Sequence, residues 1–209
     1  MQTQKMVQTL RRRLRGQLPG WDAQSNMATR VHREARIKPP SKSRKAGVMI
    51  LLYPDNGQLW IPLIKRPVYE GVHSGQMALP GGKVEETDKD IVDTAVRETE
   101  EEIGVSVDRK QIVGTLSDLY IPPSNMMVTP ILSIAHQKPV YQPDPSEVAG
   151  IFDIKLDDLL DPGNRQEVEV GRFNDTPLEA PAFMISNKVI WGATAMMLSE
   201  FLYIIQELD

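Results

Sequence analysis

The chain has 209 residues, of which 41% are hydrophobic and 25% charged, and it contains no cysteine. This length fits one domain with an extension, and the lack of thiols excludes disulfides, thiolate metal sites and cysteine nucleophiles. No apolar run reaches the roughly 18 residues of a membrane span, and no secretory signal is visible. We therefore expect a cytoplasmic protein that does not enter a membrane.

The charge is unevenly distributed along the chain. Residues 1–45 carry twelve Lys and Arg against two acidic residues, a net charge of +10, so the remainder carries −14 of the total of −4. Three hypotheses explain the basic segment: packing against its own acidic body, a basic rim that attracts a phosphorylated ligand, or a mitochondrial transit peptide. Nucleic-acid binding is disfavoured because Trp21 is the segment's single aromatic residue. We divide the chain into a basic helical extension, 1–45, and a domain, 46–209.

The first predicted elements are two helices and a hairpin. Apolar spacing predicts an amphipathic helix over 3–16 and a second helix over 23–36. A linker rich in proline and serine follows at 39–43. The apolar runs 45–53 and 58–65 flank Asp-Asn-Gly, which predicts two strands joined by a tight turn.

The remaining pattern alternates strands with a few helices. A central helix is predicted at 90–103 and a long apolar helix at 189–208. Many strands with one central and one terminal helix predict an α/β or α+β fold, with a mixed β-sheet sandwiched between helices. The other predicted elements are strands at 75–79, 111–119, 126–136 and 148–154, a helical turn at 156–160, and a pair of edge strands at 167–173 and 182–185.

Three glutamates of the central helix predict a metal site. Glu98, Glu101 and Glu102 stand at i, i+3 and i+4, so their carboxylates share one face of a helix. Three like charges at such short distances repel one another. A divalent cation reverses the sign of that energy, and Mg²⁺ and Mn²⁺ prefer oxygen ligands.

The stretch around these glutamates resembles the Nudix box, in which a glycine and a glutamate precede an Arg-Glu pair, a Glu-Glu pair and a glycine. One difference lies in the first half. Asp88 stands six residues after Gly82, where glutamate is usual, and eight residues rather than seven separate it from Arg97. The matching pairs are Arg97-Glu98, Glu101-Glu102 and Gly104-Val105.

Asp88 and the extra residue before Arg97 make this stretch similar to the coenzyme A pyrophosphatase branch of the family. The resemblance covers residues 46–208 and implies a Nudix fold. It also implies hydrolysis of coenzyme A or acyl-CoA to 3′,5′-ADP and (acyl-)4′-phosphopantetheine. Glu70-Gly71 stands where that branch usually carries Leu-Arg. Two alternatives therefore stay open: a pyrophosphatase acting on ADP-ribose or a dinucleotide, and a non-catalytic ligand-binding module. The shared positions are Arg66, His73, Gly75-Gln76, Pro80-Gly81-Gly82, Thr94-Ala95, Arg97-Glu98-Thr99 and Trp191-Gly192.

The resemblance also assigns metal and catalytic roles. Glu98, Glu101, Glu102 and the backbone of Gly82 would bind Mg²⁺ or Mn²⁺, which activates water for attack on a phosphoanhydride. Arg97 would pair with a carboxylate of the box and orient it. The general base is either Glu101 or Glu147, the latter on a loop before a strand.

The resemblance further assigns Arg66, His73 and Gln76 to substrate binding, although a structural, hydrogen-bonded role for His73 is an equal alternative. The expected partner is a small nucleotide. The basic extension and the long terminal helix also offer surface for a homodimer.

Overall fold

The structure, a computed structural model, describes residues 2–35, 37, 39–71, 73–173 and 176–208. The larger sheet in this part of the chain is mixed, because β1 and β7 run parallel and its other pairs run antiparallel. Its main path is β3 (Met77–Ala78), β2 (Gln58–Lys65), β1 (Arg44–Asp55), β7 (Met126–Ile134) and β5 (Ile112–Thr115). β4 (Gly81–Lys83), β6 (Leu119–Ile121) and β8 (Gly150–Lys155) pair with β1, β7 and β2 respectively.

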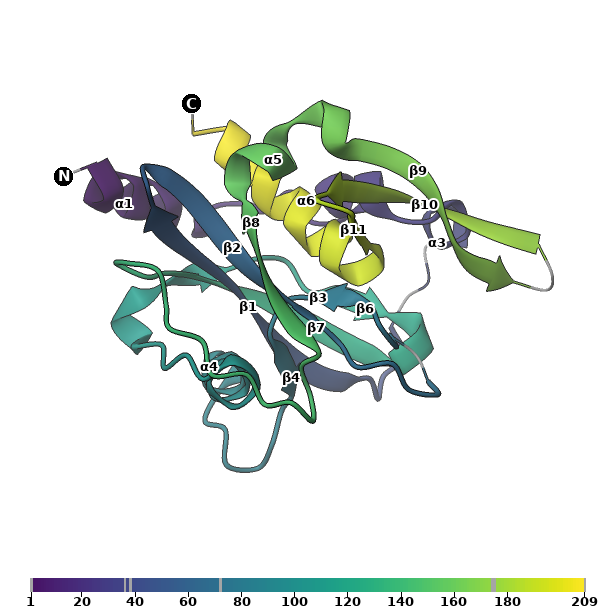
Figure 1. The fold of residues 1–209 in the computed structure, drawn as a ribbon, viewed down its shortest axis with the longest axis horizontal. Coiled ribbons are helices and arrows are strands. Elements are labelled where there is room, and N and C mark those ends of the chain that lie inside the picture. Colours follow the sequence, from purple (N-terminus) through teal and green to yellow (C-terminus); the bar gives the residue numbers. More distant parts are fainter. Residues whose placement is uncertain (1, 36, 38, 72, 174–175, 209) are drawn as a thin grey trace.

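A smaller antiparallel sheet lies beside the first (Figure 1). It consists of β11 (Lys188–Trp191), β10 (Thr176–Ile185) and β9 (Arg165–Phe173), in that order. The two predicted segments belong to strands that do pair, but the register differs, since Glu167 lies opposite Pro181 and Ala182 lies opposite Gln166. The short helix α5 (Leu156–Leu160) precedes this sheet, as predicted.

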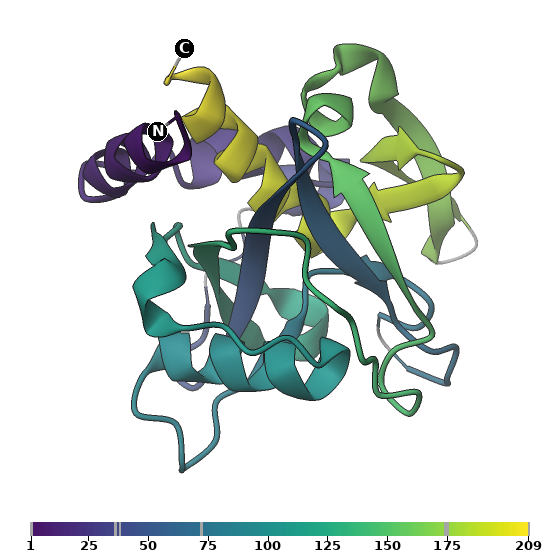
Figure 2. The same ribbon diagram turned by 60° about the vertical axis from the view of Figure 1, so that its left-hand side comes forward.

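Helices cover both faces of the larger sheet (Figures 1 and 2). α4 (Ile91–Ile103) packs on one face, and α6 (Gly192–Gln206) lies on the other beside α1 (Gln2–Leu14) and α2 (Trp21–Gln24). β1 is apolar almost throughout because both of its faces are buried. Met49 packs in the core with α4, and Ile50 packs in the core with α6. The predicted fold class is confirmed.

The predicted hairpin and the predicted central helix are also confirmed. Asn56 and Gly57 have φ values of 50° and 77°, the left-handed conformation that a two-residue turn between β1 and β2 requires. The Asp90 side chain caps α4 by accepting hydrogen bonds from the amides of Val92 and Asp93, at 3.0 and 2.9 Å. Gly104 ends the helix with a φ of 70°.

Two predicted helices were wrong in part. Residues 23–36 are not one helix, because the chain is extended at Ala28, between a 3₁₀ turn and α3 (Arg30–Ala35). The Thr29 hydroxyl accepts a hydrogen bond from the His32 amide, which starts a new helix there. Residue 36 lies outside the described residues. The terminal helix begins at Gly192 rather than 189, because Val189 and Ile190 pair with β10.

Three sheet segments are shorter than predicted. The stretch 75–79 forms only the short strand β3, and 111–119 is divided between a 3₁₀ turn, β5 and the start of β6. A register shift relative to β7 also lies within β5, between Ile112 and Gly114. The strand predicted at 148–154 begins two residues later, at Gly150, because a turn precedes it.

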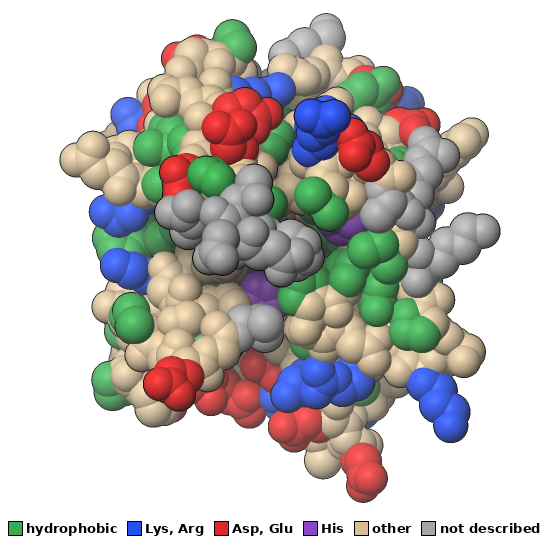
Figure 3. Space-filling model, turned by 90° about the vertical axis from the view of Figure 1, so that its right-hand side faces the viewer, with side chains coloured by type: hydrophobic (Ala, Val, Ile, Leu, Met, Phe, Trp, Pro, Cys, Tyr) green, Lys and Arg blue, Asp and Glu red, His purple; other side chains and the backbone are tan. Residues whose placement is uncertain are grey.

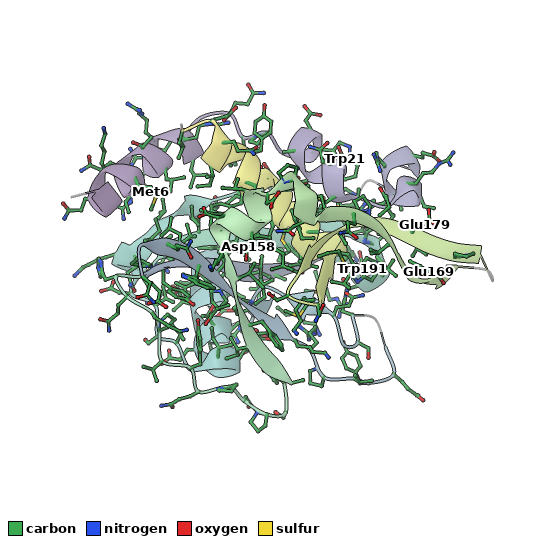
Figure 4. All side chains as sticks on the ribbon, turned by 45° about the horizontal axis from the view of Figure 1, so that its top comes forward. Met6, Trp21, Asp158, Glu169, Glu179 and Trp191 are labelled. Carbon is green, nitrogen blue, oxygen red and sulfur yellow. The ribbon has the colours of Figure 1, made fainter. Side chains whose placement is uncertain are left out.

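The N-terminal helices pack into the core on the α6 side. Leu10 is fully buried, and Met6 and Trp21 pack against the same core (Figure 4). The buried carboxylate of Glu200 on α6 accepts hydrogen bonds from the Gly20 amide and the Gln24 side chain, at 3.0 and 2.8 Å. These contacts agree with the hypothesis that the segment packs against its own body. The division at residue 45 stays a prediction.

We expect Leu10→Ala to lower the free energy of unfolding by about 3 kcal/mol, because it leaves a cavity between α1 and the sheet. Urea denaturation followed by circular dichroism measures the change. Gln8→Ala, an exposed position on the same helix, is the matched control and should change stability little. Equal stability of both variants would show that α1 is not part of the cooperative core.

Candidate active site

A cleft of about 620 Å³ lies beside the N-terminal half of α6 and the glycine pair of β4. Figure 3 shows the side of the molecule that carries the loop after β2. Asp and Glu side chains gather along the lower edge of this view, next to Lys and Arg, with hydrophobic side chains above them. The polar residues that line the cleft are Arg66, His73, Gln76, Lys83, Glu85, Glu98, Glu102, Ser124, Ser146, Glu147 and Thr194.

Arg97 is the centre of an ion-pair network on α4. Its guanidinium donates two hydrogen bonds to Asp88, at 3.0 and 3.1 Å, in the fork geometry that suits a carboxylate. Further hydrogen bonds reach Glu98 at 3.0 Å and Glu101 at 2.8 Å, and another reaches the carbonyl of Lys83 at 3.0 Å. Arg97 therefore ties the loop before α4 to the helix that carries the glutamates.

Asp88 is the principal partner of this arginine, and its side chain is only 4% exposed. It also accepts a hydrogen bond from the Thr94 hydroxyl at 2.9 Å. The Arg97 hydrogen bonds hold the pKa of Asp88 well below its usual range. The pattern alone did not identify Asp88 as the partner of Arg97, since the pairing depends on the path of the loop.

Glu102 is buried at the inner end of the cleft. One carboxylate oxygen accepts a hydrogen bond from the Gly81 amide at 2.8 Å. Burial raises the pKa of Glu102 to about 7, although this hydrogen bond and the charge of Arg66 lower it. The charges of Glu98 and Glu147 raise it further. A cation bound here would relieve both the burial cost and the repulsion.

Glu98 lies against the backbone of Gly82. A Cβ atom built at Gly82 would stand 2.4–2.5 Å from the Glu98 carboxylate, so a larger residue there would displace this carboxylate. Burial raises the pKa of Glu98, against the lowering effect of Arg97. The glycine thus allows a carboxylate and a backbone segment to meet at one point, as a shared metal site requires.

Sheet pairing brings Glu147 into the same cleft. The amide of Ala149 donates to the carbonyl of Lys65 at 2.8 Å, where β8 pairs with β2, and this contact places the Glu147 loop beside Arg66. Glu101 differs from the other glutamates, because its side chain is 54% exposed, binds Arg97 and does not line the cleft. The structure therefore brings Glu98, Glu102 and Glu147 together.

These side chains do not form a ready metal centre. Across the described residues, no three acidic or histidine side chains are grouped closely enough to hold an ion as they stand. Glu98 is bound to Arg97 and Glu102 to the Gly81 amide. The donor set nevertheless suits a divalent cation, because two carboxylates with raised pKa values and a third acidic side chain face one cleft.

The three predicted substrate-binding residues also line this cleft. The Arg66 Nε atom is buried and has no hydrogen-bond partner among the described residues. His73, with a φ of 68°, places its Nδ1 atom 3.1 Å from Oε1 of Gln76. Gln76 in turn accepts a hydrogen bond from the Arg66 amide through its carbonyl at 3.0 Å. The predicted residues form one connected group beside the glutamates.

Most of the remaining lining of the cleft is apolar, and the sequence pattern did not reveal it. Three methionines contribute from three separate elements, so only the tertiary fold brings them together. Methionine is a flexible side chain that adapts to irregular apolar ligands. The apolar lining consists of Ala46, Val48, Pro67, Met77, Ala78, Leu79, Ile121, Met126, Val128, Ala193 and Met197.

A family model for the NUDIX domain matches residues 43–172, which include most of the residues of this cleft. The chain belongs to the Nudix family. The predicted family is therefore confirmed, and the acidic stretch of α4 lies within the matched part of this Nudix chain.

Several relatives are similar over much of the Nudix chain. Nudix hydrolase 15, mitochondrial, of Arabidopsis thaliana is 38% identical over 131 residues, which are 61% of this chain and 46% of that protein. Nudix hydrolase 22, chloroplastic, of the same plant is 35% identical over 164 residues, 75% and 54% of the two chains. The human mitochondrial coenzyme A diphosphatase NUDT8 is 32% identical over 128 residues, 61% and 54%. The chain thus spans about half the length of these relatives.

Solved structures support the fold. A MutT/nudix family protein from Enterococcus faecalis has a TM-score of 0.57 at 17% identity, over 84% of this chain and 68% of that one. The NUDIX domain of Shewanella oneidensis NrtR, complexed with ADP ribose, has a TM-score of 0.50 at 18% identity, over 86% and 98%. None of the helices in the described part of the chain combines the length and apolar character needed to cross a membrane.

Proposed function

We propose that this Nudix protein is a metal-dependent pyrophosphohydrolase that cleaves coenzyme A or an acyl-CoA into 3′,5′-ADP and (acyl-)4′-phosphopantetheine. The observation that carries the proposal is the composition of the cleft. Glu98, Glu102 and Glu147 face it together with Arg66, whose buried Nε atom has no partner among the described residues. The glutamates can bind a metal ion and Arg66 can bind a phosphate group, and a diphosphate substrate needs both.

Mg²⁺ or Mn²⁺ would be held by Glu98 and Glu102, with the Gly82 backbone beside them. The resemblance also assigns Glu101 to the metal. Glu101 would bind the ion from the rim of the cleft only if its hydrogen bond to Arg97 were broken. When bound, the metal neutralises phosphate charge and lowers the pKa of water. Water then adds to one phosphorus, the bridging P–O bond breaks, and two phosphate monoesters are formed.

The side chains of the cleft divide the remaining roles. Arg66 would bind a phosphate oxygen, and His73 and Gln76 would hold the loop that continues from it. Glu147 is the better candidate for the general base, because it lines the cleft, whereas Glu101 is largely exposed and bound to Arg97. Arg97 is a positioning residue that fixes Glu98 and the loop at Asp88.

The apolar lining favours coenzyme A over smaller nucleotides. An acyl chain is flexible and apolar, and the pantetheine arm carries methyl and methylene groups between its two amides, so Met77, Met126 and Met197 offer an adaptable surface for them. ADP-ribose lacks such a group. The name of the human relative, a coenzyme A diphosphatase, points the same way. ADP-ribose or a dinucleotide stays the alternative substrate, and a non-catalytic ligand-binding module is the alternative class.

A substrate panel with Mg²⁺ or Mn²⁺ tests the proposal. We expect coenzyme A and acyl-CoA to be cleaved with kcat/KM at least about tenfold above ADP-ribose and dinucleotides, since tenfold corresponds to only 1.4 kcal/mol or so of selective binding. Mass spectrometry of the products identifies the bond, and EDTA is the control. A preference for ADP-ribose would show that the proposed substrate is wrong. A lack of turnover of every compound would favour the non-catalytic binding module.

Further properties follow from the sequence. We propose that residues 1–45 form an extension packed on a Nudix domain at 46–209. In the described part of the chain, no residue of 1–45 lines the cleft, so the basic-rim hypothesis lacks a contact there. A homodimer and a cytoplasmic location stay predictions, and two plant relatives are named mitochondrial and chloroplastic.

A further inference from the structure

The loop 67–75 at the mouth of the cleft presents an aromatic ring. The Gly75 amide donates to the carbonyl of Pro67 at 3.1 Å and so closes the loop at its base. Within the loop, the Tyr69 amide donates to the Ser74 hydroxyl at 2.9 Å. Tyr69 itself lines the cleft, although its surface is 44% exposed. Two hydrogen bonds, at Pro67 and at Tyr69, therefore tie the backbone that carries this ring to the other end of the loop.

Gly71 leaves room for the ring. A Cβ atom at Gly71 would stand 2.9 Å from Cε2 and 3.2 Å from Cδ2 of Tyr69. Any other residue here would force the ring to move, since contacts below 3.0 Å do not occur between real side chains. Gly71 therefore permits the position that the Tyr69 ring occupies.

We propose that Tyr69 stacks on the base of a purine nucleotide. Tyr69 is the only Phe, Tyr or Trp among the described residues that line the cleft. An aromatic side chain of two χ angles offers a flat surface at low entropic cost, and every base has a π-face to stack on it. The inference deepens the proposed function and rests on it, because it assumes that the cleft binds a nucleotide.

This arrangement also divides the ligand between different parts of the cleft. The phosphates belong beside the glutamates and Arg66, which lies at the base of the same loop. A base on Tyr69 would stand at the mouth, and the apolar lining would remain for the rest of the substrate. Tyr69 is therefore a specificity-determining residue, whereas the glutamates determine the reaction.

Calorimetry with AMP and with inorganic pyrophosphate tests the stacking without requiring turnover, because AMP has no phosphoanhydride bond. We expect Tyr69→Ala to raise the Kd for AMP by about tenfold or more, while the Kd for pyrophosphate stays unchanged. Tyr69→Phe keeps the ring and should bind AMP within about twofold of the wild-type protein. Gly71→Ala should weaken AMP binding as well, because it displaces the ring.

Val68→Ala is the matched control, since Val68 lies next to Tyr69 on the same loop, is 86% exposed and does not line the cleft. It should leave both Kd values unchanged. The inference is overturned if wild-type protein does not bind AMP, if Tyr69→Ala binds AMP normally, or if it weakens AMP and pyrophosphate equally. Failure to cleave coenzyme A would refute the proposed substrate, yet a selective loss of AMP binding would still support the stacking.

Discussion

Replacement of Glu102 by glutamine is expected to abolish Mg²⁺- or Mn²⁺-dependent hydrolysis, with kcat lower by on the order of 1,000-fold, since a metal ligand supplies several kcal/mol of transition-state stabilisation. The fold should survive. The raised pKa of Glu102 shows that burial disfavours its charge, so a neutral amide relieves a cost. Glutamine also keeps an oxygen that can accept the Gly81 hydrogen bond. Steady-state kinetics and thermal unfolding measure the two effects.

Two controls separate loss of the metal from loss of the fold. Glu100→Gln, an exposed position on the same helix, should leave activity unchanged. Mg²⁺ or Mn²⁺ should raise the Tm of the wild-type protein, because a ligand that binds only the folded state stabilises it. The Glu102→Gln variant should lose most of this increase. Normal turnover by this variant would remove Glu102 from the mechanism.

Replacement of Arg97 by alanine should destabilise the protein by about 3 kcal/mol and also lower kcat. The change leaves Asp88, whose side chain is 4% exposed, without its partner. It also removes the group that holds Glu98 and Glu101 in place. Arg97→Lys should be intermediate, because a single ammonium group cannot reproduce the fork at Asp88. Urea denaturation and kinetics measure the two losses.

A double-mutant cycle with Asp88→Asn identifies the cause. If the buried carboxylate is responsible, Arg97→Ala should cost less in the Asp88→Asn background. The pH dependence gives a second check. Arg97 lowers the pKa of Asp88 in the folded state, so this pair stabilises the fold above the ordinary Asp pKa of 3.8, and the contribution is lost as the pH falls through the folded-state value. Additive changes at neutral pH would show that Asp88 and Arg97 do not interact.

Local signals predicted much of this chain correctly. The turn at Asn56-Gly57 and the helix predicted at 90–103 are confirmed, because each depends on residues that are close together in the sequence. The start of the helix predicted at 189–208 was wrong, because apolar residues such as Val189 and Ile190 occur both in helices and in strands. Their pairing with β10, which is a long-range contact, makes them a strand.

The candidate site shows the same contrast between local signals and long-range contacts. The sequence by itself determined the family and the helix that carries the glutamates, because motif spacing and helical periodicity are local properties. Only the tertiary structure decided which residues share the cleft. Pairing of β8 with β2 brings Glu147 beside Arg66, while the bond to Arg97 keeps Glu101 at the rim. Such contacts join positions far apart in the chain, and no spacing in the sequence encodes the distance between them.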